Sequence, residues 1–219
     1  MVFKVSPATP SDIPGIIPIF FSSFTGPRAE ELFPPTGSGK EWLADSIEAT
    51  IANPGLGCQW LVVTDEPESS GEAVAGGEKG EKKKKKGKVV ANAMWVKHPG
   101  GEVPSWNVRM RAEPPEGVTS EALDGFFGPM ARQHHEAMGE RPHFFLESVS
   151  TDPAFRGRGL ASLLLDWGVK AADEVGWECY LDGTAKAVPL YQRYGFVGRQ
   201  EQDPDCISLP MVRPAKSLV

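Results

Sequence analysis

Apolar positions along the chain switch repeatedly between a period of two and a helical period, which predicts alternating strands and helices. Strands are expected at 3–6, 59–64, 88–96, 144–151, 179–182 and 196–200, with 206–212 as an additional candidate. Helices are expected at 13–24, 41–52, 120–138, 160–175 and 185–194. Strands interleaved with helices in this way indicate a mixed α/β or α+β fold.

The helix expected at 160–175 has the strongest periodicity in the chain. Its apolar positions are predicted to form one stripe, made of Leu160, Leu163, Leu164, Trp167, Ala171 and Val175. Gly176 follows directly and is a typical residue for ending a helix. This helix therefore begins immediately after the short run at 152–161, which contains two glycines and two arginines.

The run at 152–161 has the composition of an anion-binding turn. Gly157 and Gly159 let the backbone curl tightly and approach a ligand closely. The N–H groups at the start of the next helix, together with the helix dipole, favour a phosphate group there. Arg156 and Arg158 can add full positive charges. The spacing does not match a P-loop or the dinucleotide fingerprint, and taken alone the run also fits an ordinary tight turn with solvated arginines.

Two motifs together resemble the GCN5-related N-acetyltransferases (the GNAT superfamily). Arg156-x-x-Gly159-x-Ala161 is similar to the family's acyl-CoA pyrophosphate motif, and 187–196 is similar to its final helix, Ala-x-x-Leu-Tyr-x-x-x-Gly-Phe. The clear resemblance covers about 144–200, and the N-terminal half follows the family's order of elements. The whole chain also resembles uncharacterised fungal members. The resemblance implies a GNAT-like twisted, mostly antiparallel central sheet flanked by helices, with splayed central strands.

The resemblance also implies acetyl-CoA as acyl donor and no metal. Backbone N–H groups on the strand at 144–151 are expected to pair with the pantetheine arm and to polarise the thioester carbonyl. The residues expected to bind the cofactor are Val149, Ser150, Thr151, Arg156, Gly157, Arg158, Gly159, Leu160, Ala161, Thr184 and Tyr191. Thr184 departs from the pattern, because the family often carries Asn seven residues before the tyrosine.

Acetyl transfer to an amine requires an acid for the departing thiolate and a base for the ammonium proton. Tyr191 matches the family's general-acid tyrosine, although the same residue could simply fill the core. Glu147 is the first candidate for the base, because a carboxylate within an apolar strand is costly to bury unless it is paired or used. Strand alternation would place Glu147 on the same face as Val149 and Thr151. A satisfied structural carboxylate is the alternative for Glu147.

Other candidates for the base stay open. Asp182, at the end of the next predicted strand, is the second candidate. His134 lies on an apolar helical face and is expected in the core, while His135 and His143 have no further support. A water-mediated proton transfer, with no single base, is also compatible with the sequence.

Composition indicates one globular domain spanning 1–219, with 40% hydrophobic residues. The formal net charge is −6, although 66–88 holds seven Lys and five Glu, so the remaining residues are more acidic still. This charge argues against nucleic acid as the main partner and suits a cationic substrate. The segment 66–88 is expected to be a disordered loop inserted between two strands. Three scattered cysteines and the lack of long apolar runs lead us to expect a reduced, cytoplasmic protein without a membrane span.

The expected activity is therefore acetyl-CoA-dependent transfer of an acetyl group to an amine by direct attack in a ternary complex. The connection at 98–117 and the helix at 120–138 precede the cofactor strand and are expected to cover the acceptor mouth, which favours a small amine. A histone lysine, another protein lysine or an N-terminus is the alternative acceptor, with Lys82–Lys86 as a possible nuclear address. A non-catalytic acyl-CoA-binding interaction module is the alternative from another class.

Overall fold

The computed structural model describes residues 2–66, 87–101, 106–110, 113–200 and 202–217. Most of the loop expected at 66–88, including Lys82–Lys86, lies outside the described residues. Within the described part of the chain, no helix is long and apolar enough to cross a membrane.

A seven-stranded sheet runs through the described part of the molecule in the order β1-β2-β3-β4-β5-β7-β6. The pairs are antiparallel except for β4 and β5, which run parallel. This mixed, mostly antiparallel arrangement confirms the expected GNAT-like fold. The strands are β1 (Val2–Pro7), β2 (Cys58–Glu66), β3 (Lys88–His98), β4 (His143–Thr151), β5 (Glu178–Gly183), β6 (Val197–Gly198) and β7 (Leu209–Arg213).

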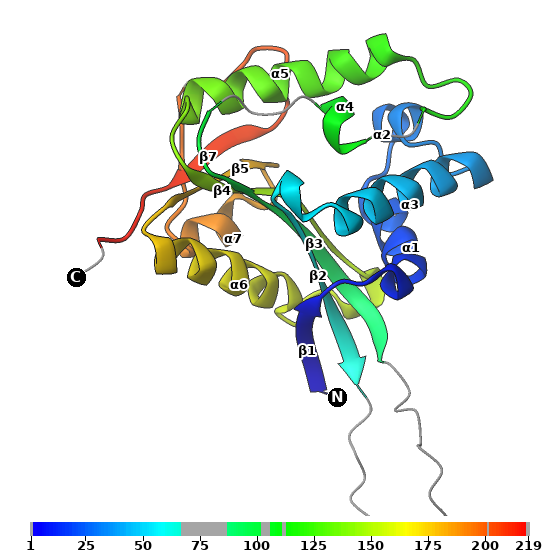
Figure 1. The fold of residues 1–219 in the computed structure, drawn as a ribbon, viewed down its shortest axis with the longest axis horizontal. Helices are drawn as coiled ribbons and strands as arrows, with labels where there is room; N and C mark the ends of the chain where they lie inside the picture. The colour runs from blue at the N-terminus through cyan, green and yellow to red at the C-terminus, as the bar shows by residue number, and fades with distance from the viewer. Residues whose placement is uncertain (1, 67–86, 102–105, 111–112, 201, 218–219) are drawn as a thin grey trace, which may run out of the picture.

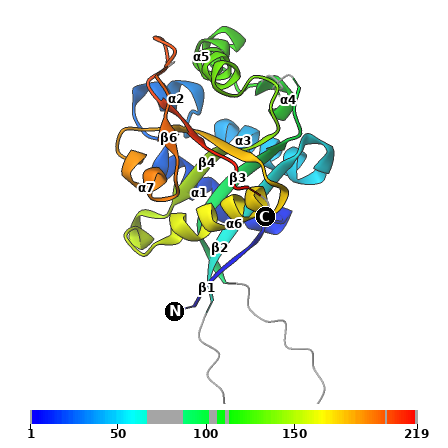
Figure 2. The ribbon, with the colours of Figure 1, turned by 90° about the vertical axis from the view of Figure 1, so that its left-hand side faces the viewer.

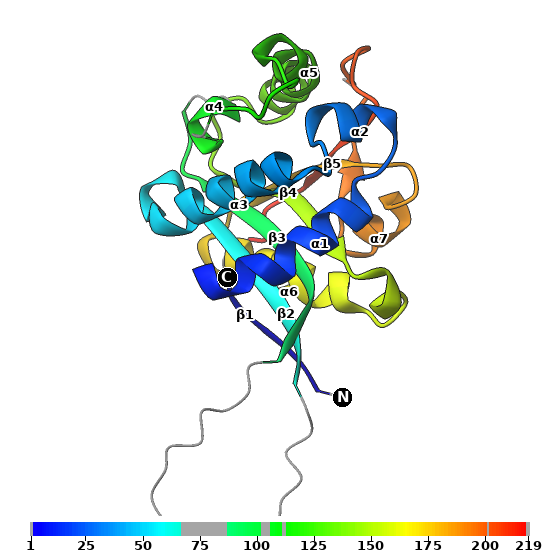
Figure 3. The same cartoon turned by 90° about the vertical axis from the view of Figure 1, so that its right-hand side faces the viewer.

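Helices cover both faces of the sheet (Figures 1 and 3). They are α1 (Ile13–Ser23), α2 (Pro27–Leu32), α3 (Gly37–Ala52), α4 (Trp106–Arg109), α5 (Ser120–Met138), α6 (Leu160–Val175) and α7 (Val188–Arg193). Helices α1 and α3 pack on one face, and α6 and α7 pack on the other. Helix α5 lies across one end of the sheet, away from α6 (Figure 2). The short helices α2 and α4 were not expected from the sequence.

Two buried clusters hold these layers together. The first joins α1, α3 and α5 to the sheet, with Ile16, Ile47 and Leu123 almost fully buried. The second joins α6 and α7 to the opposite face and includes Trp95 and Leu164. Burial of a large aliphatic side chain contributes about 1.5–3 kcal/mol, so the two clusters rather than the short helices are expected to dominate stability.

The buried face of helix α6 is rotated relative to the apolar stripe expected at 160–175. Its buried positions are Leu160, Leu164, Leu165, Gly168 and Ala172. Val175, expected in the stripe, is 39% exposed. Gly168 explains the shift, because a Cβ atom at this position would lie 2.0 Å from Trp95 Cε2. The indole of Trp95 occupies the place of a side chain, and its Nε1 donates a hydrogen bond to the carbonyl of Leu164 (3.2 Å).

Replacing Gly168 with Ala should destabilise the fold by about 3 kcal/mol, because the new methyl group overpacks against the buried Trp95 ring. The gain in helix propensity, about 1 kcal/mol, is too small to compensate. Gly125→Ala on α5 is the matched control, since its nearest contact would be Arg28 Nη2 at an ordinary 3.6 Å. Urea unfolding of both variants measures the difference. Equal stability of Gly168→Ala and the natural chain would contradict this packing.

Candidate active site

A β-bulge in β4 sets the direction of Glu147. Met94 of β3 pairs with Ser148, whereas the next residue, Trp95, pairs with Leu146. Glu147 is therefore the extra residue of the bulge, and a bulge redirects side chains locally. Both Glu147 and Ser148 line the pocket described below, while Val149 packs against the second cluster on the other face. The expectation that Glu147 shares a face with Val149 is wrong for this reason.

Strands β4 and β5 separate just beyond the bulge. Their pairing runs from His143–Glu178 to Leu146–Leu181 and ends there, although β4 continues to Thr151. The last residues of β4 keep their partners on β3, where Asn92 pairs with Ser150. The edge of β4 that faces β5 is therefore without a strand partner among the described residues from 147 onward. This separation is the splay that the family resemblance implied.

The turn after β4 has the geometry of an open cradle. Gly157 and Gly159 both have φ of 78°, a left-handed conformation that side chains rarely adopt. A Cβ atom added at either glycine would meet no heavy atom within 4 Å. Asp152 holds the start of the turn, because its Oδ1 accepts from the N–H of Ala154 (3.0 Å). Gly159 is the N-cap of α6, so the first N–H groups of that helix face the same open space.

The arginines of the turn lie at its rim. Arg156 donates to the carbonyl of Thr151 and to that of Ser22 at the end of α1, both at 3.3 Å. The Arg158 guanidinium lies over the Phe155 ring, 5.0 Å from its centroid. Both side chains are exposed. Leu160 is buried in the second cluster, so its backbone rather than its side chain is what α6 presents to the turn.

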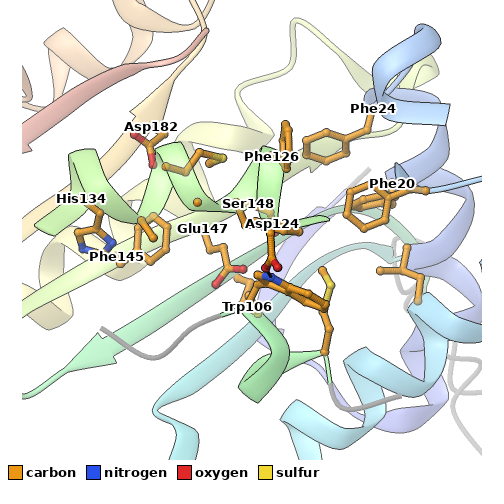
Figure 4. A pocket seen from close by; sticks show the side chains of 18 of the residues that line it. Phe20, Phe24, Trp106, Asp124, Phe126, His134, Phe145, Glu147, Ser148 and Asp182 are labelled. Atoms are coloured by element: carbon orange, nitrogen blue, oxygen red, sulfur yellow. Dashed lines mark hydrogen bonds between the residues drawn. The ribbon is translucent and has the colours of Figure 1, made fainter. Parts of the chain in front are cut away.

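A pocket of about 490 Å³ lies on the other side of β4, beneath α5 (Figure 4). Aromatic and other apolar side chains make up most of its wall, and a few polar residues interrupt it. The lining residues are Phe20, Phe24, Phe33, Leu43, Trp60, Met94, Trp106, Met110, Asp124, Phe126, Phe127, Gly128, Met130, Ala131, Arg132, His134, Phe145, Glu147, Ser148 and Asp182. Concave, mostly apolar pockets of this size are typical of small-molecule sites.

Asp182 is a pocket carboxylate that is held by two hydrogen bonds. Its Oδ1 accepts hydrogen bonds from the Tyr180 hydroxyl (2.7 Å) and from Gln133 Nε2. Its Oδ2 is buried and has no hydrogen-bond partner among the described residues. Burial raises the pKa of the Asp182 carboxyl to about 6, and the hydrogen bonds from Tyr180 and Gln133 offset part of that rise. A carboxyl with this pKa is mostly ionised at neutral pH and can still exchange a proton.

Tyr191 lies in α7, and its side chain is next to Gly183, the last residue of β5. Its ring lies 3.3 Å from where a Cβ of Gly183 would be, and it packs edge-on against Phe196. The side chain is buried, and burial raises the pKa of its phenol to about 12. The hydroxyl is therefore protonated throughout the physiological range. Tyr191 is not among the residues lining the pocket, and Thr184 is exposed.

The three candidate histidines divide into a buried pair and an exposed residue. His134 and His143 are buried, and their Nε2 atoms share a hydrogen bond of 2.7 Å. Burial lowers the pKa of His143 to about 4, and its Nδ1 is bonded to the carbonyl of Arg141 (2.7 Å). A neutral His143 must donate from Nδ1 to that carbonyl, so its Nε2 accepts from His134. His134 is in the core as expected, although one side of it also lines the pocket, and His135 is exposed.

Several residues of the site were not expected from the sequence. The pocket's aromatic residues come from α1, β2, α4, β4 and α5 and from the positions directly after α1 and α2, and the short helix α4 supplies Trp106. Gln133 and Tyr180, which hold Asp182, carry no motif. The helical periodicity of 120–138 did indicate Phe126, Phe127 and Met130 as one face, and these three line the pocket. Within the described residues, no group of three His, Cys, Asp or Glu side chains is placed to hold a metal ion.

Comparison with known proteins relates this arrangement to one family. Residues 125–196 match the model of the Acetyltransferase (GNAT) family. The histone acetyltransferase HPA2 and related acetyltransferase from Corynebacterium glutamicum aligns over 100% of this chain and 99% of its own, with 22% identity and a TM-score of 0.57. The PaiA N-acetyltransferase from Thermoplasma acidophilum, in complex with coenzyme A, aligns over 98% of this chain and 99% of its own, with 11% identity and a TM-score of 0.54.

A third similar structure is the NatC complex bound to Gag peptide and CoA. It aligns over 99% of this chain and 100% of its own, with 11% identity and a TM-score of 0.51. At these identities the likeness concerns the fold, and the match at 125–196 adds the sequence pattern. The chain thus has the fold of the GNAT acetyltransferases over almost its whole length and the sequence pattern of that family over residues 125–196.

Proposed function

We propose that the protein is an acetyl-CoA-dependent N-acetyltransferase that moves an acetyl group to a small amine. The observation that carries this proposal is the position of β4 between two dissimilar sites. Its end leads into the open glycine turn, and its bulge directs Glu147 and Ser148 into the acidic, aromatic pocket. Where β4 and β5 separate, a donor bound at the turn can meet an acceptor bound in the pocket.

The turn fits the diphosphate of coenzyme A. The open space beside Gly157 and Gly159, the first N–H groups of α6 and the two rim arginines together suit a multiply charged phosphate group. The free edge of β4 at Val149, Ser150 and Thr151 suits the amide groups of a pantetheine arm. The related PaiA and NatC structures contain coenzyme A. When bound, acetyl-CoA would supply the thioester whose carbonyl carbon the amine attacks.

Asp182 accepts the proton of the incoming ammonium in this proposal. Its raised pKa and its Oδ2 atom suit that role. This assignment reverses the order expected from the sequence, in which Glu147 came first. Glu147 lines the same pocket, and its carboxylate attracts and orients the cationic acceptor.

Tyr191 supplies the proton that the departing thiolate takes up. Its buried phenol is protonated at neutral pH, as an acid must be. Direct attack by the amine needs no covalent acyl-enzyme, and none of the described residues lining the pocket is a cysteine. Cys179 is buried, and burial raises the pKa of its thiol to about 12, so it is a poor nucleophile.

Thiol release from acetyl-CoA in the presence of an amine panel tests the proposal. The panel contains small amines, lysine-containing peptides and peptides with a free N-terminus. Release that depends on a small amine, with the acetylated amine identified by mass spectrometry, is the expected result. If no acceptor of the panel gives thiol release, the proposed activity is contradicted. If only the peptides give thiol release, the acceptor is a protein, as the Gag peptide of the NatC structure illustrates.

The pH dependence of kcat/KM should show the ionisation of Asp182. The base acts when it is deprotonated, so activity rises with pH through the pKa of about 6. Because the ammonium binds protonated and gives its proton to Asp182, the slope of log(kcat/KM) should fall from about one to about zero near that pH. Asp182→Asn should remove this change of slope and lower kcat/KM by about 10²-fold or more. If Glu147→Gln removes it and Asp182→Asn does not, the base is Glu147.

A further inference from the structure

The wall of the acceptor pocket is an aromatic cluster that is already packed into place. Trp106 of α4 stacks on Phe127 of α5, with ring centroids 6.1 Å apart and planes at 23°. Phe127 meets Phe33 edge-on, and Phe33 in turn meets Phe20. Rings held by one another lose little conformational freedom when a ligand binds, which favours affinity.

Part of this aromatic surface is open. Phe24 is 39% exposed, and Trp106, Phe126 and Phe127 are partly exposed. These rings gather on one pocket instead of being scattered over the molecule. In Figure 4, Phe20 and Phe24 lie toward one end of the pocket, Asp182 and His134 lie toward the other, and Glu147 and Ser148 lie between them. Apolar surface concentrated in this way marks a site for an apolar ligand.

The charged side chains that line the pocket are mainly carboxylates. Three carboxylates line it, those of Asp124, Glu147 and Asp182. Arg132 is the cationic side chain of the described lining, and its guanidinium is bound by Asp203 (2.8 Å) and by Asp205 (3.6 Å) outside the pocket. The lining therefore complements one positive charge placed near the sheet and an uncharged apolar body placed against the rings.

Asp124 also holds Trp106 in the wall of the pocket. Its Oδ1 accepts a hydrogen bond of 2.7 Å from the indole Nε1 of Trp106. This bond joins α4 to α5 and holds the indole against Phe127. Asp124 thus acts as a positioning residue for Trp106, and its charge is partly used in that contact.

Resting on the proposed transferase activity, we propose that the acceptor is a small monoamine with an aromatic or similarly apolar body, and that Trp106, held by Asp124, determines this specificity. The ammonium lies at the carboxylates near the β4–β5 separation, and the apolar body lies against Trp106, Phe126 and Phe24. A second ammonium group at the far end of the acceptor would lose hydration against these rings, and the Asp124 carboxylate there is exposed and already accepts a hydrogen bond from Trp106.

Matched amines test the substrate class with thiol release from acetyl-CoA. Hexylamine and hexamethylenediamine have the same chain and differ in the second ammonium group, and phenylethylamine and ethanolamine contrast an aromatic body with a polar one. We expect kcat/KM to be roughly tenfold or more higher for hexylamine than for the diamine, and higher still for phenylethylamine. A preference for the diamine, for ethanolamine or for a peptide would overturn the inference while leaving acetyl transfer established.

Pocket variants test the role of Trp106. Trp106→Ala should raise the KM for phenylethylamine about tenfold and leave the KM for ethanolamine and for acetyl-CoA unchanged, with kcat nearly constant. Trp177→Ala is the matched control, because Trp177 is a partly buried tryptophan in the cluster on the other face of the sheet. Asp124→Asn keeps an oxygen acceptor for the indole and should therefore raise the KM for phenylethylamine less than Asp124→Ala, which should approach the effect of Trp106→Ala.

The two levels of failure are distinguishable. Equal KM values for phenylethylamine in Trp106→Ala and the natural chain would overturn the specificity role even if acetyl transfer is robust. If none of the amines gives thiol release, the proposed transferase and this inference are overturned together. Calorimetry of phenylethylamine binding tests the pocket independently of turnover. We expect the natural chain and Trp177→Ala to show a heat of binding and Trp106→Ala to show none.

Discussion

Replacing Gly159 with Asp is expected to weaken acetyl-CoA binding by about 100-fold or more, whereas replacing it with Asn should cost less than about tenfold. Both side chains tolerate the left-handed conformation that Gly159 adopts with φ of 78°, and both have the same size. They differ in charge. The Asp side chain puts an anion into the open space that the proposal assigns to the diphosphate.

Equilibrium dialysis with labelled acetyl-CoA measures this difference, and melting temperatures of the two variants control for folding. The Asn variant carries the backbone and steric cost without the charge. Equal affinity of the Asp and Asn variants would show that no phosphate lies at the turn. Such a result would contradict the placement of the cofactor even if some binding persisted elsewhere.

Replacing Tyr191 with Phe is expected to lower kcat by about 10²-fold and to leave the KM for the amine and the affinity for acetyl-CoA nearly unchanged. The phenol is buried against Phe196, so the loss of the hydroxyl alone leaves the packing intact. Because the pKa of Tyr191 is raised to about 12, the acid stays protonated and should cause no loss of activity up to about pH 10.

Tyr194→Phe is the control for this experiment. Its hydroxyl donates to the carbonyl of Ser162 (3.1 Å) and is assigned to packing, so steady-state kinetics should show kcat within about threefold of the natural chain. Full turnover in Tyr191→Phe would show that Tyr191 is not the acid that protonates the thiolate. A natural chain that binds acetyl-CoA and shows no turnover would support the interaction module instead.

The order of the elements could be predicted from the sequence because each long element has a clear period. Helix α5 was predicted with its bounds of Ser120–Met138, and α6 with both its start and its end at Gly176, which has φ of 67°. The phase of α6 could not be predicted. Gly168 faces the core because Trp95, on a strand distant in sequence, fills the space of a side chain.

The cofactor side of the site could be predicted more fully than the acceptor side. The turn at 152–161 is contiguous in the sequence, and its glycines indicate the left-handed backbone conformation that the structure shows. The direction of Glu147 depends on a bulge, which arises from pairing with β3 and has no signature within 144–151. The pocket brings together α1, α4, α5 and β5, so its aromatic wall becomes visible only when these segments are packed.

Calorimetric titration of the natural chain with acetyl-CoA tests whether the glycine turn at Gly157 and Gly159 binds the acyl donor. Saturable binding of one molecule per chain is expected, weakened by added salt because charged phosphate contacts contribute to it. The absence of binding would contradict the proposed transferase, since the turn would then hold no diphosphate and the pocket would have no acyl donor to meet.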